Sequence, residues 1–156
     1  MKKYFPEFIG ILICLCIVIL AGTATSLSDF NWYAALTKPS FNPPNWIFGP
    51  VWVVLYILIG IAMGKLWRIR KESPITFSIF LIQLFMNLLW SYLFFQYHRV
   101  DLALYDIAIL WFSIMTLWLM VFKRKTIFYL LLPYGLWVSF AFLLNIMIFT
   151  LNYPLQ

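Results

Sequence analysis

Five long stretches without charge dominate the pattern of hydrophobic and polar positions along the chain. A helix needs about 20 residues to cross the hydrocarbon core of a bilayer, and most of the stretches reach that length. The apolar residues show no two-residue alternation, so the pattern predicts helices and excludes a transmembrane barrel. The fourth stretch is the shortest and reaches full length if Leu102–Tyr105 and Asp106 belong to it. The stretches are Phe8–Ser28, Pro39–Gly64, Ser73–Tyr97, Ile107–Phe122 and Thr126–Gln156.

This pattern predicts an all-α fold, an integral-membrane bundle of five transmembrane helices in a single membrane domain over residues 1–156. In the chain 65% of the residues are apolar and 10% are charged, whereas about a quarter of a soluble domain is charged. Lipid must therefore cover most of the surface, and we expect a multi-pass protein of the cell membrane. The expected helices cover about 6–27, 46–67, 75–97, 101–122 and 127–150, with a proline-rich loop over 28–45.

Basic residues gather at one end of this five-span arrangement. Nine lie on the side of the N-terminus, and two, Lys38 and Arg99, lie on the other side. Because basic loops stay in the cytoplasm, we expect a cytoplasmic N-terminus and a C-terminus outside. The net charge of +6 does not indicate nucleic-acid binding, since the cations form short clusters at helix ends and no continuous stripe. The nine are Lys2, Lys3, Lys65, Arg68, Arg70, Lys71, Lys123, Arg124 and Lys125.

The residues that usually carry chemistry are scarce. Cys14 and Cys16 are two positions apart on one predicted helix, so they point to nearly opposite faces and cannot share a metal ion. His98, the chain's single histidine, has no cluster of cysteines or carboxylates beside it in the sequence, so we expect no metal site. The sequence offers no nucleophile–base pair, glycine-rich phosphate loop or paired carboxylates. We therefore expect no resident cofactor, and neither hydrolysis nor phosphoryl transfer.

The segment after the first predicted helix is the least ordinary part of the chain. Pro39, Pro43 and Pro44 stiffen it and prevent a continuous helix. It is also rich in aromatic residues, which two arrangements explain. The aromatic rings form a belt at the membrane–water interface, or the segment is an ordered lid over a cavity. The prolines favour the lid, because a belt does not require them.

Stripes of aromatic and polar residues on three predicted helices meet beneath this segment. Trp52 and Tyr56 lie one turn apart on the second helix. An amide that faced lipid would be unfavourable, so Asn87 and Asn145 are expected to face the interior. Either the stripes form a ligand pocket, or their polar groups hold neighbouring helices together. Asp106 either reaches the interface or pairs with an interior donor. The other two stripes are Gln83, Asn87, Trp90, Ser91 and Phe94, and Trp137, Ala141, Leu144 and Asn145.

The run WYAALTKPSFNPPNWIFGPVW, from Trp32 to Trp52, resembles the signature of the tryptophan-rich sensory protein family (TspO/MBR). The similarity continues through the remaining helices and covers essentially the whole chain. Its further matches are Leu55-Tyr56, Gly60, Ala62, Gln83, Asn87, Trp90-Ser91, Phe94-Phe95, Ala103-Leu104, Asp106, Pro133-Tyr134, Trp137, Phe140-Ala141 and Leu144-Asn145.

The resemblance implies a five-helix membrane receptor that binds porphyrins and isoquinoline or benzodiazepine ligands, often as a homodimer. Some bacterial members of the family degrade protoporphyrin IX with light and oxygen, so Trp52 and Trp137 become the candidate catalytic residues. Whether such loss of porphyrin is enzymatic turnover or sensitised photochemistry stays open, as do an exporter of porphyrins and a membrane scaffold. The expected ligand-binding residues are Tyr33, Lys38, Trp52, Tyr56, Asn87, Trp90, Ser91, Trp137, Ala141 and Asn145.

Three further expectations concern single positions. Lys38 is expected to pair with porphyrin propionates, with the ring entering from the outer side, because a buried carboxylate needs a partner. Sterol transport is not expected, since Asn145 is followed by Ile146 and no basic residue occurs after Lys125. Leu102 stands where mitochondrial members of the family have tryptophan. The GxxxG motif of Gly60 and Gly64 allows a close helix contact, either within the chain or in a dimer.

Overall fold

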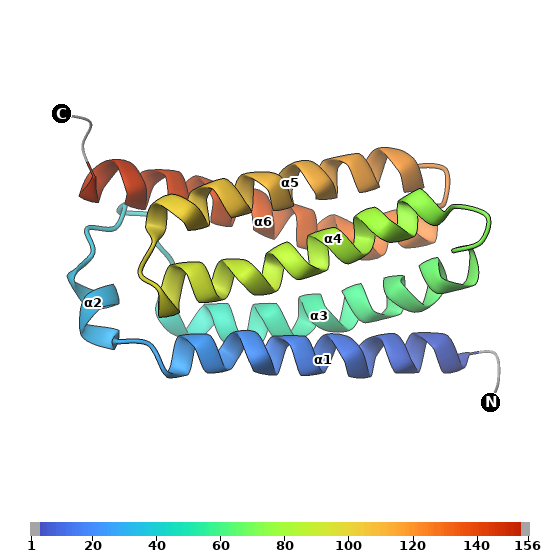
Figure 1. Cartoon of the computed structure of the whole chain (residues 1–156), viewed down its shortest axis with the longest axis horizontal. Coiled ribbons are helices and arrows are strands. Elements are labelled where there is room, and N and C mark those ends of the chain that lie inside the picture. Colours follow the sequence, from blue (N-terminus) through green and yellow to red (C-terminus); the bar gives the residue numbers. More distant parts are fainter. Residues whose placement is uncertain (1–3, 154–156) are drawn as a thin grey trace.

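Five long apolar helices lie side by side along the molecule and alternate in direction (Figure 1). The computed structural model describes residues 4–153; Lys2 and Lys3, which contributed to the charge count, lie outside this range. Each of the five is long and apolar enough to cross a membrane, which confirms the predicted all-helical architecture. The helices are α1 Phe5–Ser26, α3 Asn45–Arg68, α4 Pro74–Ser91 with its π-helical extension η2 Tyr92–Gln96, α5 Val100–Val121 and α6 Lys125–Asn152.

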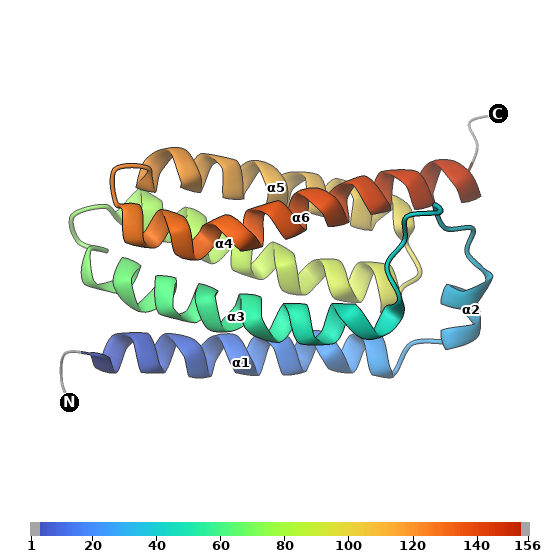
Figure 2. The ribbon, with the colours of Figure 1, turned by 180° about the vertical axis from the view of Figure 1, so that it is seen from behind.

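A sixth, short helix crosses one end of the bundle. This helix, α2 (Phe30–Ala35), lies where α1 ends and α3 begins, as the reverse view shows (Figure 2). The sequence predicted a loop over 28–45 and missed it. The prolines begin only at Pro39, and the Asp29 carboxylate accepts a hydrogen bond from the Asn31 backbone N–H at 2.9 Å, which caps the helix start. The α3–α4 and α5–α6 turns lie at the opposite end.

Glycines bring α1 and α3 into backbone contact in the half of the bundle away from α2. A Cβ on Gly60 would lie 2.5 Å from the Cα of Ile11, and Cβ atoms on Gly10 and Gly64 would be equally crowded by backbone. Beyond these glycines, Arg68 donates a hydrogen bond to the Glu7 carboxylate at 2.7 Å. The GxxxG motif therefore makes its close contact inside the chain.

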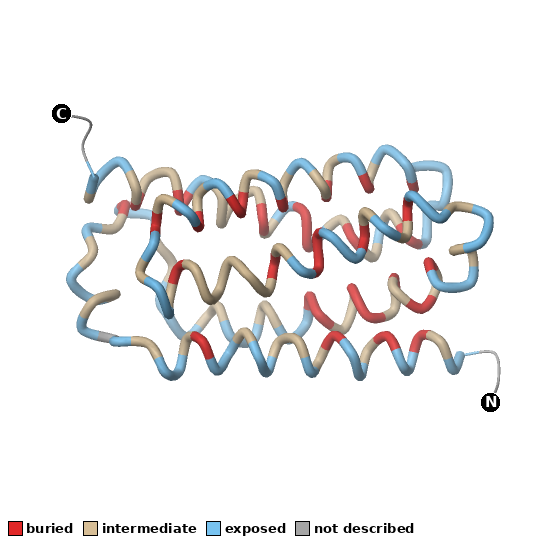
Figure 3. The backbone as a smooth tube through the Cα atoms, viewed as in Figure 1, coloured by how far each residue is buried: buried red, intermediate tan, exposed pale blue. Residues whose placement is uncertain are grey.

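Packing differs between the two halves of the bundle. Within the described part of α3, every buried residue lies between Leu55 and Leu66, and none lies in 45–54 (Figure 3). The half of the bundle away from α2 is thus filled by side chains, including the fully buried Ile59, Leu66 and Phe80. The first turns of α3 face a hollow beneath α2 instead, and this hollow is the candidate site.

Candidate functional site

The hollow is a cavity of about 530 Å³ in the half of the bundle that α2 covers. Helices α1, α3, α4, α5 and α6 contribute to its wall, and Tyr33 of α2 lines it as well. Nine of the ten predicted ligand-binding residues line it; whether they contact a ligand stays a prediction. They are Tyr33, Trp52, Tyr56, Asn87, Trp90, Ser91, Trp137, Ala141 and Asn145.

A chain of hydrogen bonds between side chains forms the deepest part of the site. The Tyr56 hydroxyl donates to Asn87 Oδ1, and Asn87 Nδ2 donates to the Tyr134 hydroxyl at 3.1 Å. The Tyr134 hydroxyl then donates to Gln83 Oε1 at 2.7 Å. All four residues are buried, so these bonds satisfy groups that water does not reach. Tyr56 and Asn87 also line the cavity, which gives its apolar wall a fixed polar spot.

Sequence reasoning missed Tyr134 as a member of this chain of bonds. The signal was present, since Tyr134 precedes Trp137 by three residues and Ala141 by seven, which continues the α6 stripe by one turn. Pro133 directly before it did not end the helix. The periodicity thus places Tyr134 on the interior face, but it does not reveal which partner the hydroxyl meets.

Two indoles, Trp52 and Trp137, contribute aromatic surface to the cavity wall. The Trp52 ring lies 5.8 Å from the ring of Tyr56 and 6.4 Å from that of Tyr134, measured between centroids. The Trp137 ring lies 5.8 Å from Phe48. Its Nε1 is buried and meets no hydrogen-bond acceptor among residues 4–153, so a donor in the cavity wall is left for a ligand.

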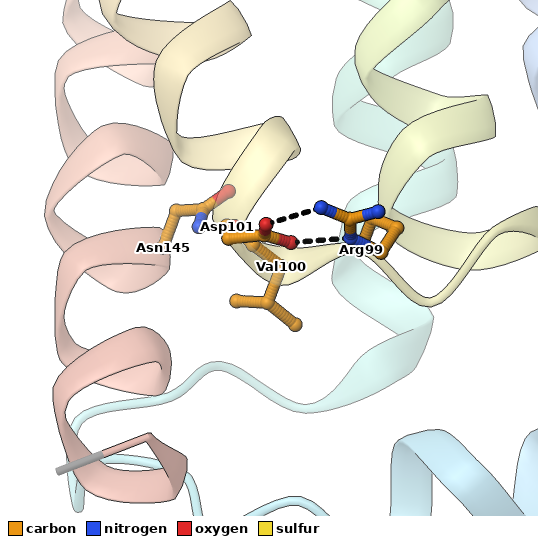
Figure 4. A network of polar contacts seen from close by, with 4 residues as sticks. All are labelled: Arg99, Val100, Asp101 and Asn145. Atoms are coloured by element: carbon orange, nitrogen blue, oxygen red, sulfur yellow. Dashed lines mark hydrogen bonds and ion pairs between the residues drawn. The ribbon is translucent and has the colours of Figure 1, made fainter.

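Asn145 connects three helices in the wall of the cavity. Trp90 Nε1 donates to Asn145 Oδ1 at 2.9 Å, and Asn145 Nδ2 donates to the Val100 carbonyl oxygen at 3.3 Å. Figure 4 shows the Asn145 amide beside Val100, with the Arg99–Asp101 pair close by. Asn145 therefore holds α4, α5 and α6 together, as one of the two interpretations expected, and it also lines the cavity, while ligand binding by Asn145 stays a prediction.

Lys38 is the predicted binding residue that does not line the cavity. Its ammonium donates to the carbonyl oxygens of Tyr33 and Leu36, the latter at 3.1 Å, and lies 4.4 Å from the Tyr33 ring centroid. Burial lowers the pKa of Lys38. Arg99, the other basic residue at this end, makes two hydrogen bonds to the Asp101 carboxylate at 2.6 and 2.8 Å. Both cations are thus engaged within the protein.

The lid over the cavity is α2 together with the strap 36–44. The Trp32 ring stacks on the His98 imidazole, with centroids 4.1 Å apart. His98 holds a left-handed backbone conformation, φ 53°, at the turn between η2 and α5. On the far side, Asn152 bonds both backbone groups of Thr37 at 2.9 Å. Trp32 and Tyr33 belong to the lid. Trp46 is 74% exposed, which is the exposure expected of a residue in an interfacial aromatic belt.

Asp106 meets neither of the expectations from the sequence. It is 4% exposed, so it does not reach the interface, and neither of its carboxylate oxygens has a hydrogen-bond partner among residues 4–153. It does not line the cavity, although its neighbours Ile107 and Leu110 do. Within the same range, no group of three or more histidine, cysteine or acidic residues is placed to hold a metal ion.

Comparison with known proteins gives this cavity a family context. The TspO/MBR family model matches residues 10–151, nearly the whole chain. The chain belongs to the TspO/MBR family. Together with the five apolar helices, this makes it a multi-pass membrane protein. The resemblance first seen in the run from Trp32 to Trp52 is thereby confirmed.

Several curated TspO/MBR proteins are similar over most of their length. The tryptophan-rich protein TspO of Chlorobaculum tepidum is 38% identical over 151 residues, 92% of this chain and 95% of that protein. That of Archaeoglobus fulgidus is 38% identical over 145 residues, 92% of this chain and 94% of the relative. The translocator protein of Bos taurus is 32% identical over 133 residues, 81% of this chain and 78% of the relative.

Proposed function

We propose that this TspO/MBR protein is a membrane receptor for flat tetrapyrroles such as protoporphyrin IX, and for isoquinoline- or benzodiazepine-type ligands. The supporting observation is the cavity of about 530 Å³, which has indole walls and the Tyr56–Asn87 pair as a polar spot. Such a site suits a large planar molecule, because the rings stack on its faces while a few polar groups fix its orientation. The ligand is held without a resident cofactor.

The binding test uses the full-length protein in phosphatidylcholine nanodiscs, titrated with protoporphyrin IX and followed by quenching of tryptophan fluorescence. We expect saturable one-site binding that an isoquinoline carboxamide displaces. Absence of saturable binding for both ligands would overturn the receptor proposal.

We further propose that the bound porphyrin is degraded when it is illuminated in the presence of dioxygen. Dioxygen is the oxidant, and both of its atoms add across one methine bond of the ring. The indoles of Trp52 and Trp137 act as transient electron donors to the excited ring and recover their electron before the product leaves. No other reductant is needed, which suits a chain without the usual catalytic groups.

The chemistry is tested with Trp52→Phe and Trp137→Phe, which keep an aromatic wall but remove the oxidisable indole. Porphyrin affinity should change by less than about tenfold, because stacking on an aromatic face is retained. Loss of porphyrin under light should slow markedly, and mass spectrometry should find a wild-type product heavier by two oxygen atoms. Equal rates in the wild type and both variants would remove the indoles from the mechanism.

Orientation and assembly complete the proposal. We propose that the N-terminus and the basic turns are cytoplasmic, so that α2 and the cavity lie toward the outer surface. The supporting observation is that Lys71, Lys123 and Arg124 lie in turns at the end away from α2, and Lys125 begins α6 at the same end. A reporter fused after Gln156 should be active outside the cytoplasm. A homodimer would have to use a face other than that of Gly60 and Gly64, which α1 covers.

A further inference from the structure

Some residues of α1 and α3 line the cavity and are also among the exposed residues of the bundle. They occur at helical spacing along the two edges that face each other, in the half that α2 covers. This combination indicates an opening of the cavity sideways, between the two helices, toward the surface that lipid covers. The residues are Ile19, Gly22 and Ser26 on α1, and Asn45, Gly49 and Val53 on α3.

The register of the α1–α3 pair places these residues opposite one another. The helices are antiparallel, and Gly10 meets Gly60 in the packed half. Counting one turn at a time from this pair brings Gly22 opposite Gly49. The residues on either side then pair in the same way, Ile19 with Val53 and Ser26 with Asn45. The two edges therefore form a single seam, and we call these six residues the α1–α3 seam.

Glycine has opposite surroundings in the two halves of this helix pair. At Gly60 a Cβ would be 2.5 Å from backbone, so glycine permits close packing there. At Gly22 and Gly49 a Cβ would meet no described atom within 4 Å apart from the neighbouring residues and backbone of its own helix. Close packing does not explain these two glycines, whose missing side chains leave the seam open.

The end of the bundle offers a less open route than the side. The lid is held at two points far apart, by the stack of Trp32 on His98 and by the two hydrogen bonds between Thr37 and Asn152. Opening the end requires both contacts to break, whereas no hydrogen bond or ion pair among the described residues joins the six seam residues across the gap.

We propose that the α1–α3 seam is a lateral portal, through which the site takes ligands dissolved in the bilayer. This inference rests on the proposed function and adds the substrate class, planar apolar molecules that partition into lipid. It replaces the expected route through the outer end. Four of the six seam residues are glycine or aliphatic and none is charged, so an ionised carboxylate cannot pass at low cost. A porphyrin diacid passes with its carboxylates trailing at the interface, and its diester passes without that restriction.

The test compares association and dissociation rates of protoporphyrin dimethyl ester with the full-length protein in phosphatidylcholine vesicles preloaded with the ester. Gly22→Leu and Gly49→Leu narrow the seam, and the open space around both glycines accommodates the added side chain. We expect both rates to fall about tenfold while Kd changes by less than about twofold, because a barrier affects both directions equally. Thr23→Leu is the matched control, since exposed Thr23 lies on the same helix but does not line the cavity.

A second variant keeps the proposal testable if leucine perturbs the fold. Gly22→Cys with Gly49→Cys, in a Cys16→Ser background, is linked by a short bis-thiol reagent; Cys14 is buried and should not react. Linking before the ester is added should exclude it, and linking afterwards should retain it. Unchanged rates in the leucine variants, or free exchange after linking, would overturn the portal. If Trp32→Ala accelerates exchange and the seam variants leave both rates unchanged, the route is through the lid. Wild-type protein that binds no ester would instead contradict the proposed function.

Discussion

Gly60 lies so close to Ile11 that a single added carbon would overlap the backbone of α1. This contact holds α1 and α3 together in the half of the bundle away from the lid. The cavity is lined by other turns of the same two helices, from Val18 onward on α1 and up to Tyr56 on α3.

We predict that Gly60→Ala destabilises the protein by about 1–3 kcal/mol, because the added carbon must displace backbone. Gly22→Ala is the control, with open space around the new carbon. There alanine should be neutral or stabilising by up to about 1 kcal/mol, through its better helix propensity. Thermal unfolding in detergent measures both. Equal melting temperatures for the two variants would show that the contact does not carry stability.

The hydrogen-bonded side chains of Asn87, Tyr134 and Gln83 allow a role of Asn87 in ligand binding to be distinguished from a role in helix packing. Asn87→Leu and Gln83→Leu each leave the Tyr134 hydroxyl short of a partner, so each should lower stability by about 1–3 kcal/mol. Asn87 lines the cavity and Gln83 does not. Affinity for a carbonyl-bearing isoquinoline should therefore fall by about 1–2 kcal/mol in Asn87→Leu alone. If both variants bind as tightly as wild type, Asn87 only holds helices together.

The lid contact at His98 combines a ring stack with a left-handed backbone. His98→Asn tolerates that backbone but removes the stack, while His98→Phe keeps a flat ring. Loss of the stack, worth about 0.5–1.5 kcal/mol, should speed hydrogen exchange of the lid amides by about two- to tenfold in the asparagine variant only. Equal exchange in all three proteins would show that Thr37 and Asn152 are sufficient to hold the lid.

Lys38 stays the predicted partner of porphyrin propionates, although its ammonium bonds carbonyl groups of its own segment. Lys38→Gln should weaken binding of the diacid by about 0.2–1 kcal/mol relative to the dimethyl ester, as for an exposed ion pair. The difference should shrink as salt is raised from low to high concentration. Equal losses for diacid and ester would assign Lys38 to capping α2, with no part in ligand binding.

Long apolar runs made the five helices predictable, because crossing a bilayer imposes a length that composition reveals. The stripe of Asn87, Trp90 and Ser91 was predictable as well, since interior positions recur every three or four residues. Helix α2 was not, because its six residues are too few to show a period. The partner of the Gly60–Gly64 motif was also hidden, since the same spacing serves contacts within a chain and between chains.

The contacts of single polar groups could not be predicted from the sequence, for a different reason. Tyr134 and Lys38 have long side chains whose polar ends lie several bonds from the backbone, so their positions in the sequence do not determine their partners. Asp106 shows most clearly that the sequence does not predict the partner of a polar group. An intramembrane carboxylate predicts a partner, yet none of the described residues provides one.

The two hydrogen bonds between Thr37 and Asn152 join residues 115 positions apart. During synthesis the strap is therefore made, and the helices around it are inserted, long before its partner exists. The covered end of the cavity is completed only when the last turn of α6 has left the ribosome and entered the membrane. A chain that stops short of Asn152 can assemble its other contacts and still lack this fastening.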